Sequence, residues 1–231
     1  MARTARSRDD QPVSTHPDPW PLRHLVLRTP RLELRPDDDA GLLELAEVAH
    51  QGVHPADEMP FGQPWTDADP ADLGRNTVQF FWGLRAALRP DAWSVHFLIR
   101  VDGRVIGIQG LKGDDFAVTR EVHTGSWLGQ RHQGRQGRGY GTEMRAAVLA
   151  LAFDHLGAEQ ARSGVFTDNP ASAGVSRKLG YQPDGTRLLA RRKERATEAR
   201  LLVTREQFDA HRPEWTLQVE GLDACRPLLG V

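Results

Sequence analysis

The residue types and spacings that could do chemistry gather in two segments in the second half of the chain. In the first, glycines alternate with larger residues at the start of a stretch with helical periodicity: Gln136-Gly137-Arg138-Gly139-Tyr140-Gly141-Thr142. Glycines leave backbone N–H groups uncovered, and the N-terminus of a helix attracts negative charge. We therefore interpret this run as a phosphate-binding loop. The alternative interpretation is a flexible turn between a strand and a helix.

Two common phosphate motifs do not match this loop. A dinucleotide-binding fold needs a glycine where Thr142 stands, and a P-loop needs a Gly-Lys-Ser/Thr triplet, which does not follow. Both readings are excluded. The triplet Gln133-Gly134-Arg135 is nearly repeated by Gln136-Gly137-Arg138. We expect this repeat to lengthen the loop by about three residues, either as a harmlessly extruded turn or as a change in which N–H groups bind.

The second segment is Asn169-Pro170-Ala171-Ser172, followed by Val175-Ser176-Arg177-Lys178-Leu179-Gly180-Tyr181. Asparagine is a favoured residue immediately before a helix, and proline is favoured at the first helical position. The sequence therefore predicts a capped helix start at Asn169, with Ser172 in its first turn. An amide and a hydroxyl on that turn are also suited to contact a ligand, and the two roles are compatible.

Hydrophobic periodicity and turn residues predict the elements that must position these segments. The expected strands lie at 25–28, 32–35, 93–101, 105–111, 118–128, 162–167, after residue 181 and at 200–204. The expected helices lie after residue 39 and at 71–88, 142–156, 170–179 and 206–212. Segment 51–69 is predicted as a long functional loop, 187–200 as a solvated connection between strands, and 215–219 as one more strand. This order of elements predicts a mixed α/β sheet rather than a doubly wound one.

Composition excludes several classes of protein. The chain has 231 residues with a formal net charge of −1, which argues against a nucleic-acid or membrane-surface binder. No apolar run reaches the roughly 18 residues of a membrane span. A single cysteine, Cys225, suits a reducing cytoplasm and has no histidine at a motif spacing, so a covalent acyl-cysteine is not expected. The histidines lack metal-ligand spacing, and no metal site is predicted.

The same features divide the chain into three parts. Residues 1–21 are polar with several prolines, and we expect a mobile N-terminal arm there. Residues 22–212 are expected to form the catalytic domain, and residues 213–231 a C-terminal extension that adds a strand or a dimer contact.

Three motifs in order carry a family resemblance. The pattern Gln136-x-x-Gly139-x-Gly141 resembles the acyl-CoA pyrophosphate signature of the GNAT superfamily of N-acyltransferases. The segment from Asn169 to Tyr181 and the opening Thr29-Pro30-Arg31-Leu32-Glu33-Leu34-Arg35 resemble its RimJ/RimL-like branch. More narrowly, Gly125-Ser126-Trp127-Leu128 and the tail resemble an actinobacterial subgroup that includes a mycobacterial GNAT using succinyl-CoA.

The resemblance implies a GNAT fold, in which a mostly antiparallel sheet flanked by helices is splayed between its fourth and fifth strands, 118–128 and 162–167. It implies that acetyl-CoA or succinyl-CoA is the acyl donor. The residues expected to bind the acyl-CoA lie in these motifs and at the end of the fourth strand. They are Trp127, Leu128, Gln136, Gly137, Arg138, Gly139, Tyr140, Gly141, Thr142, Asn169 and Ser172. Ser172 is also expected to protonate the leaving thiolate, and backbone N–H groups near Ser126 and Trp127 to polarise the thioester carbonyl.

An amine acceptor needs a proton acceptor near the thioester. Amines are mostly protonated at pH 7, with a pKa of about 7.7–8.0 for an α-amine and about 10.4 for lysine. His123 stands in the strand 118–128, where RimJ/RimL-like proteins often carry a glutamate, and a histidine has a suitable pKa. A surface or packed histidine is the alternative. Glu121 shares the face of His123 by strand alternation and is the reserve candidate.

The sequence thus predicts transfer of an acetyl or succinyl group from CoA to a small-molecule amine or a protein amine by direct attack in a ternary complex. The alternative is a non-catalytic acyl-CoA-binding sensor or interaction module, suggested by the lengthened loop. On family grounds, a homodimer or higher homo-oligomer through the tail is expected.

Overall fold

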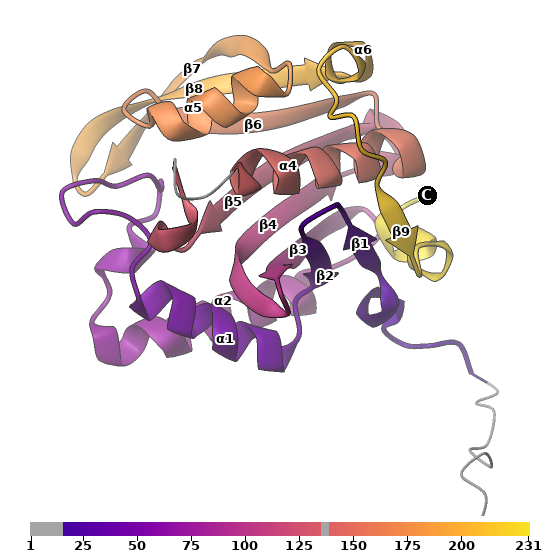
Figure 1. Ribbon diagram of the computed structural model, residues 1–231, viewed down its shortest axis with the longest axis horizontal. Helices are drawn as coiled ribbons and strands as arrows, with labels where there is room; N and C mark the ends of the chain where they lie inside the picture. The colour runs from indigo at the N-terminus through magenta and orange to yellow at the C-terminus, as the bar shows by residue number, and fades with distance from the viewer. Residues whose placement is uncertain (1–15, 135–138) are drawn as a thin grey trace, which may run out of the picture.

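The protein is described here by a computed structural model that covers residues 16–134 and 139–231 (Figure 1). The described residues form one nine-stranded sheet in the order β7-β8-β6-β5-β4-β3-β2-β1-β9. Pairing is antiparallel throughout, except between β5 and β6, which are parallel. This is the mixed, mostly antiparallel α/β architecture that the order of elements predicts.

The strands are β1 (Val26–Arg28), β2 (Glu33–Pro36), β3 (Ala92–Val101), β4 (Arg104–Asp114), β5 (Glu121–Leu128), β6 (Gln160–Phe166), β7 (Gln182–Arg191), β8 (Glu194–Thr204) and β9 (Gln218–Glu220). The α-helices are α1 (Asp39–His50), α2 (Pro70–Ala87), α3 (Phe116–Thr119), α4 (Tyr140–Ala150), α5 (Pro170–Lys178) and α6 (Arg205–Asp209). A π-helical stretch, Leu151–Leu156, continues α4, and Gly157 ends it with a φ of +79°.

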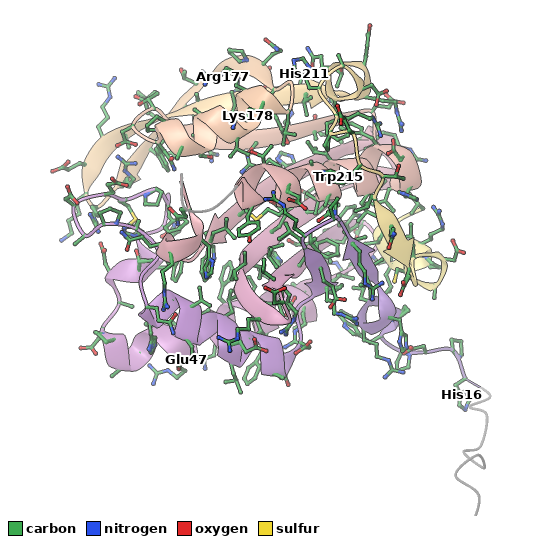
Figure 2. All side chains as sticks on the ribbon, in the orientation of Figure 1. His16, Glu47, Arg177, Lys178, His211 and Trp215 are labelled. Carbon is green, nitrogen blue, oxygen red and sulfur yellow. The ribbon has the colours of Figure 1, made fainter. Side chains whose placement is uncertain are left out.

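Two layers of helix cover the two faces of the sheet. Helices α1 and α2 pack on one face through Leu42, Leu45, Val78 and Phe81, which meet Ile108 of β4 among other residues. Helix α4 covers the other face, and nearly all of its residues are buried. Figure 1 shows α5 beside α4, in front of β6. Figure 2 places Glu47 of α1 and Arg177 of α5 on opposite sides of the molecule.

The chain between β4 and β5 differs from the expected single strand 118–128. A short helix, α3, precedes β5, which begins at Glu121. Asp115 and Arg120 flank this helix in left-handed backbone conformations, with φ of +46° and +49°. Phe116 between them is fully buried against Trp93. Tertiary packing of one aromatic ring therefore decides this element, because the local sequence also suits an extended strand.

The segment 187–200 is a β-hairpin and not the solvated connection that its charges suggest. Strands β7 and β8 pair from Arg191 and Glu194 outward. The two residues of the turn, Arg192 and Lys193, both have positive φ. Such a turn matches the twist of a hairpin, but it usually contains asparagine or glycine. The turn at Arg192 and Lys193 contains neither residue, and for this reason the sequence did not indicate a hairpin here.

The C-terminal segment belongs to the sheet. Strand β9 pairs with β1, two residues beyond the midpoint of the expected strand 215–219. Leu217, Leu222, Cys225 and Leu229 lie in the same core as α4. At the other end, residues 1–15 of the predicted mobile arm lie outside the described residues, whereas Leu22 is already buried. None of the helices in the described ranges is long and apolar enough to cross a membrane.

Candidate active site

The sheet opens between β5 and β6. Their parallel pairing covers only residues Glu121 to His123 on β5 and ends at His123 opposite Arg162. Strand β4 continues to pair with β5 as far as Leu128, and β8 continues to pair with β6 as far as Phe166. The part of β5 after His123 therefore has no strand partner on its β6 side. This is the predicted splay between the fourth and fifth expected strands, and it leaves backbone groups available to an extended ligand.

Helix α4 begins beside this opening. Gly139 precedes the helix in a left-handed conformation, with a φ of +83°, and its carbonyl accepts hydrogen bonds from the N–H groups of Thr142 and Glu143. Within the described residues, the N–H groups of Tyr140 and Gly141 have no acceptor. They are suited to bind an anion. The predicted contacts Gln136, Gly137 and Arg138 lie outside the described residues.

A buried carboxylate fixes the start of α4. Glu143 accepts hydrogen bonds from the Thr29 hydroxyl (2.6 Å) and from the Arg31 backbone N–H (3.2 Å) and Nε (2.6 Å). The guanidinium of Arg31 also lies over the ring of Tyr140. The opening motif at residues 29–35 therefore holds the helix whose N-terminus the glycine loop reaches. The motif at residues 29–35 and the glycine loop therefore meet at the N-terminus of α4.

The third motif lies directly beside α4. The Asn169 side chain accepts a hydrogen bond from the Ser172 N–H at 3.0 Å, which confirms the predicted helix cap at Asn169 with Pro170 after it. A methyl group on Gly141 would lie 3.6 Å from Val175 of α5 and 4.0 Å from Leu128 of β5. The cap, the start of α4 and the end of β5 thus meet at one place, and the Ser172 side chain is half-buried there.

The fourth predicted strand contributes Trp127 and Leu128 in different ways. The indole of Trp127 lies on the α1/α2 face and contacts Trp65, which contacts Phe61 in turn. Leu128 is buried, and its carbonyl accepts a hydrogen bond from Gln133 Nε2. Gln133 Nε2 also reaches the Val53 carbonyl. The chain that leads into the glycine loop is therefore fastened to both β5 and the long segment 51–69.

His123 and Glu121 share one face of β5, with His123 Nε2 3.4 Å from a Glu121 carboxylate oxygen. The other carboxylate oxygen of Glu121 accepts hydrogen bonds from Arg162 Nε (2.7 Å) and Gln160 Nε2 (2.6 Å). Glu121 is thus already paired with a cation. His123 is exposed, and its backbone stands opposite Arg162 where the strand pairing ends. Both side chains point away from α4 and α5, so they face the opening from the other side of the sheet.

A second histidine on this face was not predicted. Strand register places His96 of β3 opposite Gly110 of β4, and Gly110 opposite Gly125 of β5. A methyl group on Gly110 would lie 3.1 Å from His96 Nε2, whereas one on Gly125 would have no neighbour within 4 Å. The ring of His96 packs edge-on against Phe81, and burial lowers its pKa to about 4. Gly110 and Gly125 therefore leave part of the sheet surface without side chains, next to a histidine that is neutral at pH 7.

The opposite face of the opening holds a buried polar group. Arg145 of α4 is buried, and its guanidinium donates to Ser176 Oγ (2.9 Å) and Ser126 Oγ (3.3 Å). Burial lowers the pKa of Arg145. The neighbouring Tyr181 hydroxyl bonds to Thr124 Oγ1 at 2.9 Å, and burial raises the pKa of Tyr181. No local pattern in the sequence indicates this cluster, because its members come from α4, α5 and β5 and meet only in the folded chain.

The segment 51–69 and the β7–β8 hairpin meet over the α1/α2 face. Arg192 in the hairpin turn forms a bidentate ion pair with Asp67, with distances of 2.6 Å from Nη2 to Oδ1 and 2.7 Å from Nε to Oδ2. Arg191 donates to the Met59 carbonyl at 2.7 Å and pairs with Asp168. We call this connection the clasp (residues 56–67 with Arg191 and Arg192). Figure 1 shows the two segments approaching one another beside β5 and β6.

Comparison with known proteins agrees with this geometry. A family model for the acetyltransferase (GNAT) domain matches residues 25–182. The structure of RimJ from Mycobacterium smegmatis in complex with CoA-disulfide is similar, with a TM-score of 0.66, 20% identity and coverage of 89% of this chain and 94% of that chain. The spermidine N-acetyltransferase of Vibrio cholerae in complex with CoA and spermine matches with a TM-score of 0.59 and 12% identity, over 78% and 99% of the two chains.

A third similar structure is a putative ribosomal-protein-serine acetyltransferase from Vibrio cholerae, with a TM-score of 0.59, 16% identity and coverage of 78% and 97%. At these identities the structures show a common fold. The family model covers most of the chain, and the chain therefore belongs to the GNAT acetyltransferase family.

Proposed function

We propose that this protein is an acyl-CoA-dependent N-acyltransferase that moves an acetyl or succinyl group to an amine by direct attack in a ternary complex. The observation that carries this proposal is the opening between β5 and β6, flanked on one face by the start of α4 and by the capped helix α5. An opening with access from both faces lets donor and acceptor meet without a covalent enzyme intermediate.

The donor substrate is assigned to the face with α4 and α5. The N–H groups of Tyr140 and Gly141, which have no acceptor among the described residues, suit the diphosphate of CoA, and Gly139 adds no side chain to the approach. The unpaired stretch of β5 before Leu128 suits the amide groups of the pantetheine arm. Asn169 keeps its capping bond while its N–H₂ group is available to the same arm.

The reaction needs one nucleophile, one proton acceptor and one proton donor. The lone pair of the neutral amine attacks the thioester carbonyl carbon, a C–N bond forms, and the C–S bond breaks. The sulfur leaves with the electron pair and takes a proton, which we assign to the half-buried hydroxyl of Ser172. The proton lost by the amine nitrogen passes to a base on the α1/α2 face. Backbone N–H groups near Ser126 stabilise the developing oxyanion.

We assign the proton acceptor to His96, acting through water, with His123 as the alternative. His96 lies beside the bare backbone of Gly110 and Gly125. Burial lowers its pKa to about 4, so His96 is a weak base that would relay the proton through water to the solvent and not keep it. Glu121 is a weaker candidate, because its carboxylate is engaged by Arg162 and Gln160. His123 remains the alternative, because it is exposed at the point where the strands part.

The acceptor is assigned to the face covered by the clasp. Two of the similar structures are a ribosomal-protein-serine acetyltransferase and a spermidine N-acetyltransferase with spermine. A ribosomal protein and a small polyamine are thus the kinds of acceptor named for proteins of this fold, and we propose a protein amine or a small-molecule amine for this chain. The row of rings from His54 through Phe61 and Trp65 to Trp127 lines the approach and suits the apolar stem of an amine.

A thiol-release assay tests the proposal. Purified protein is incubated with acetyl-, propionyl- or succinyl-CoA and a panel of protein N-termini, lysine peptides, polyamines and small amines, and free CoA is measured with a thiol reagent. The single cysteine, Cys225, is buried and burial raises the pKa of its thiol to about 11, so it adds little background. Amine-dependent release supports the proposal. Binding of acyl-CoA without release for any amine would instead favour a non-catalytic sensor.

A further inference from the structure

Two exposed glycines stand where β5 and β6 part, on the face of the sheet that the clasp borders. The last paired residues of the two strands are His123 and Arg162, and two residues further along each strand stand Gly125 and Gly164. Side chains alternate between the two faces of a strand, so these glycines lie on the same face as His123 and Arg162. We call this bare part of the sheet the glycine gap (Gly125 and Gly164).

Large side chains border the glycine gap along both strands. By the same alternation, the neighbours on this face are His123 and Trp127 on β5, and Arg162 and Phe166 on β6. Phe166 is buried, with the guanidinium of Arg191 in the clasp 4.4 Å from the centre of its ring. The glycine gap therefore exposes backbone between positions that are covered by side chains.

A carboxylate lies against the glycine gap. Glu198 of β8 pairs in register with Phe166 of β6, so its side chain belongs to the same face. A methyl group on Gly164 would lie 2.7 Å from Cδ and Oε1 of Glu198 and 3.0 Å from Oε2. The carboxylate thus takes the place that a side chain at position 164 would fill. The Glu198 side chain is 14% exposed, so it is largely shielded from water.

One oxygen of this carboxylate is unused. Oε2 of Glu198 accepts a hydrogen bond from Nε of Arg187 at 2.7 Å, and the Arg187 side chain is 59% exposed. Within the described ranges no donor bonds to Oε1, which is the oxygen nearer to Gly164. A carboxylate oxygen shielded from water is stabilised by a hydrogen-bond donor. Glu198 therefore offers an acceptor position to a ligand in the glycine gap.

Other carboxylates near the opening have both oxygens engaged. Glu121 contacts His123 through one oxygen and Arg162 through the other. Asp67 uses both of its oxygens on Arg192. The protein itself neutralises these two groups, whereas Glu198 keeps one oxygen for a donor from outside.

We propose that Glu198 binds the nitrogen of the acceptor in the glycine gap and selects a cationic amine over a neutral hydroxyl. This inference rests on the proposed function for the position of the donor. A hydrogen bond from an ammonium group to a carboxylate is charge-assisted, and an alcohol cannot form it. A nitrogen that attacks the thioester carbon is positively charged until it loses its proton. The same carboxylate stabilises that charge, while the proton passes to the base.

Binding of the nitrogen can be measured without turnover. n-Butylamine and n-butanol, which differ only in the terminal group, are each titrated into the full-length protein saturated with CoA, and the backbone amide signals of Gly125 and Gly164 are followed by NMR. We expect n-butylamine to shift both signals and n-butanol to shift neither. Glu198→Gln keeps the shape and removes the charge, so it should raise the Kd of n-butylamine about 10- to 100-fold.

The same loss should appear in turnover. In the thiol-release assay with saturating acyl-CoA, Glu198→Gln should lower kcat/KM for the amine about 10- to 100-fold. The Kd of CoA should change less than about 3-fold, because Glu198 lies on the face away from α4 and α5. Glu198→Asp keeps the charge on a shorter side chain and should retain part of the activity.

Three variants separate this role from a structural one. Arg187→Gln breaks the same ion pair and leaves the carboxylate in place, so the Kd of n-butylamine should stay within about 3-fold of the wild type. Glu194→Gln removes an exposed carboxylate at the start of the same strand and should change nothing. Gly164→Ala sets a methyl group against the carboxylate and should weaken binding as much as Glu198→Gln does. This variant provides the test if Glu198→Gln does not fold.

The outcomes distinguish this inference from the proposed function. Three results would overturn the role of Glu198 while amine-dependent thiol release could still occur: no n-butylamine shifts in the wild type, an unchanged Kd in Glu198→Gln, or an equal loss in Arg187→Gln. Binding of n-butylamine that depends on Glu198, in a protein that releases no thiol with any amine, would support the site and contradict the enzyme.

Discussion

Ser172 is the residue where a structural role and a chemical role can be separated. Its backbone N–H is the donor that Asn169 caps, and its hydroxyl is the group that we propose to protonate the leaving thiolate. Substitution at Ser172 therefore removes the proposed acid and keeps the cap, whereas substitution at Asn169 removes the cap itself.

We expect Ser172→Ala to lower kcat by about 100-fold with little change in the affinity for acyl-CoA, because loss of a general acid affects the transition state. Steady-state kinetics and calorimetric binding of CoA provide the measurement. Asn169→Ala is the comparison, since the loss of a helix cap costs about 1 kcal/mol and should weaken binding as well. A kcat equal to that of the wild type would remove Ser172 from the mechanism.

His96 differs from His123 in its surroundings. Burial lowers the pKa of His96 to about 4. A histidine whose pKa is lower in the folded state than its usual value of about 6.5 stabilises the fold less as the pH falls from 6.5 through 4. The free energy of unfolding falls with falling pH because the unfolded chain binds the proton of His96 more readily than the folded chain does.

We expect His96→Asn to lower kcat about 10- to 100-fold, and His123→Ala to lower it less than about 3-fold, if His96 accepts the proton. NMR of the histidine ring protons should show His96 unprotonated down to about pH 5. Denaturant unfolding should show that the wild type loses more stability than His96→Asn between pH 7 and 4. A larger loss of kcat in His123→Ala would reassign the base to His123.

At the scale of elements, the clasp connects two segments that are far apart in the sequence. Asp67 and Arg192 are 41% and 32% exposed, so their ion pair contributes less than about 1 kcal/mol to global stability. Its effect is local, because it joins the segment 51–69 to the end of the β7–β8 hairpin over the face that we propose for the acceptor.

We expect Asp67→Asn to raise the KM of the amine severalfold while the KM of acyl-CoA changes little, because the clasp lies on the acceptor side only. Hydrogen exchange of residues 53–67 should accelerate, and the melting temperature should fall by no more than a few degrees. Asp72→Asn, which breaks an exposed pair within α2, is the matched control and should leave both KM values unchanged. A change confined to acyl-CoA would contradict this assignment.

At the scale of the whole molecule, the C-terminal segment completes the fold. Strand β9 extends the sheet at β1, and Figure 2 places Trp215 where the chain passes α4. The apolar side chains of the tail are buried in the core of their own chain. Trp215, Leu228 and Val231 are only partly buried, and the homo-oligomer expected through the tail stays a prediction.

We expect a chain cut after His211 to be destabilised by about 5–10 kcal/mol and to aggregate, because several core side chains, each worth about 1.5–3 kcal/mol, would be lost. Chemical denaturation and light scattering of the truncated and full-length proteins provide the measurement. Lys193→Ala in the distant hairpin turn is a control for general handling. Normal stability of the truncated chain would show that the tail is dispensable.

How much could be predicted from the sequence depends on the range of the interactions. The cap at Asn169 and the start of α4 involve neighbours in the chain, and they were recognisable from residue types alone. The β7–β8 hairpin was missed because charged residues occur on both of its faces, so it lacks the alternation that marks a half-buried strand.

The sequence by itself determined the family, the order of elements and the two motifs beside the donor site, because these depend on residues close together in the chain. Only the tertiary structure decided which side chains share a site. The row from His96 to Gly125 exists through the register of three strands. The burial of Arg145, whose Nε has no acceptor among the described residues, depends on every element packed around it, and no local pattern encodes that. Strand register and burial depend on contacts between residues far apart in the sequence. For this reason, which polar side chains meet on each face of the sheet could be seen only in the folded chain.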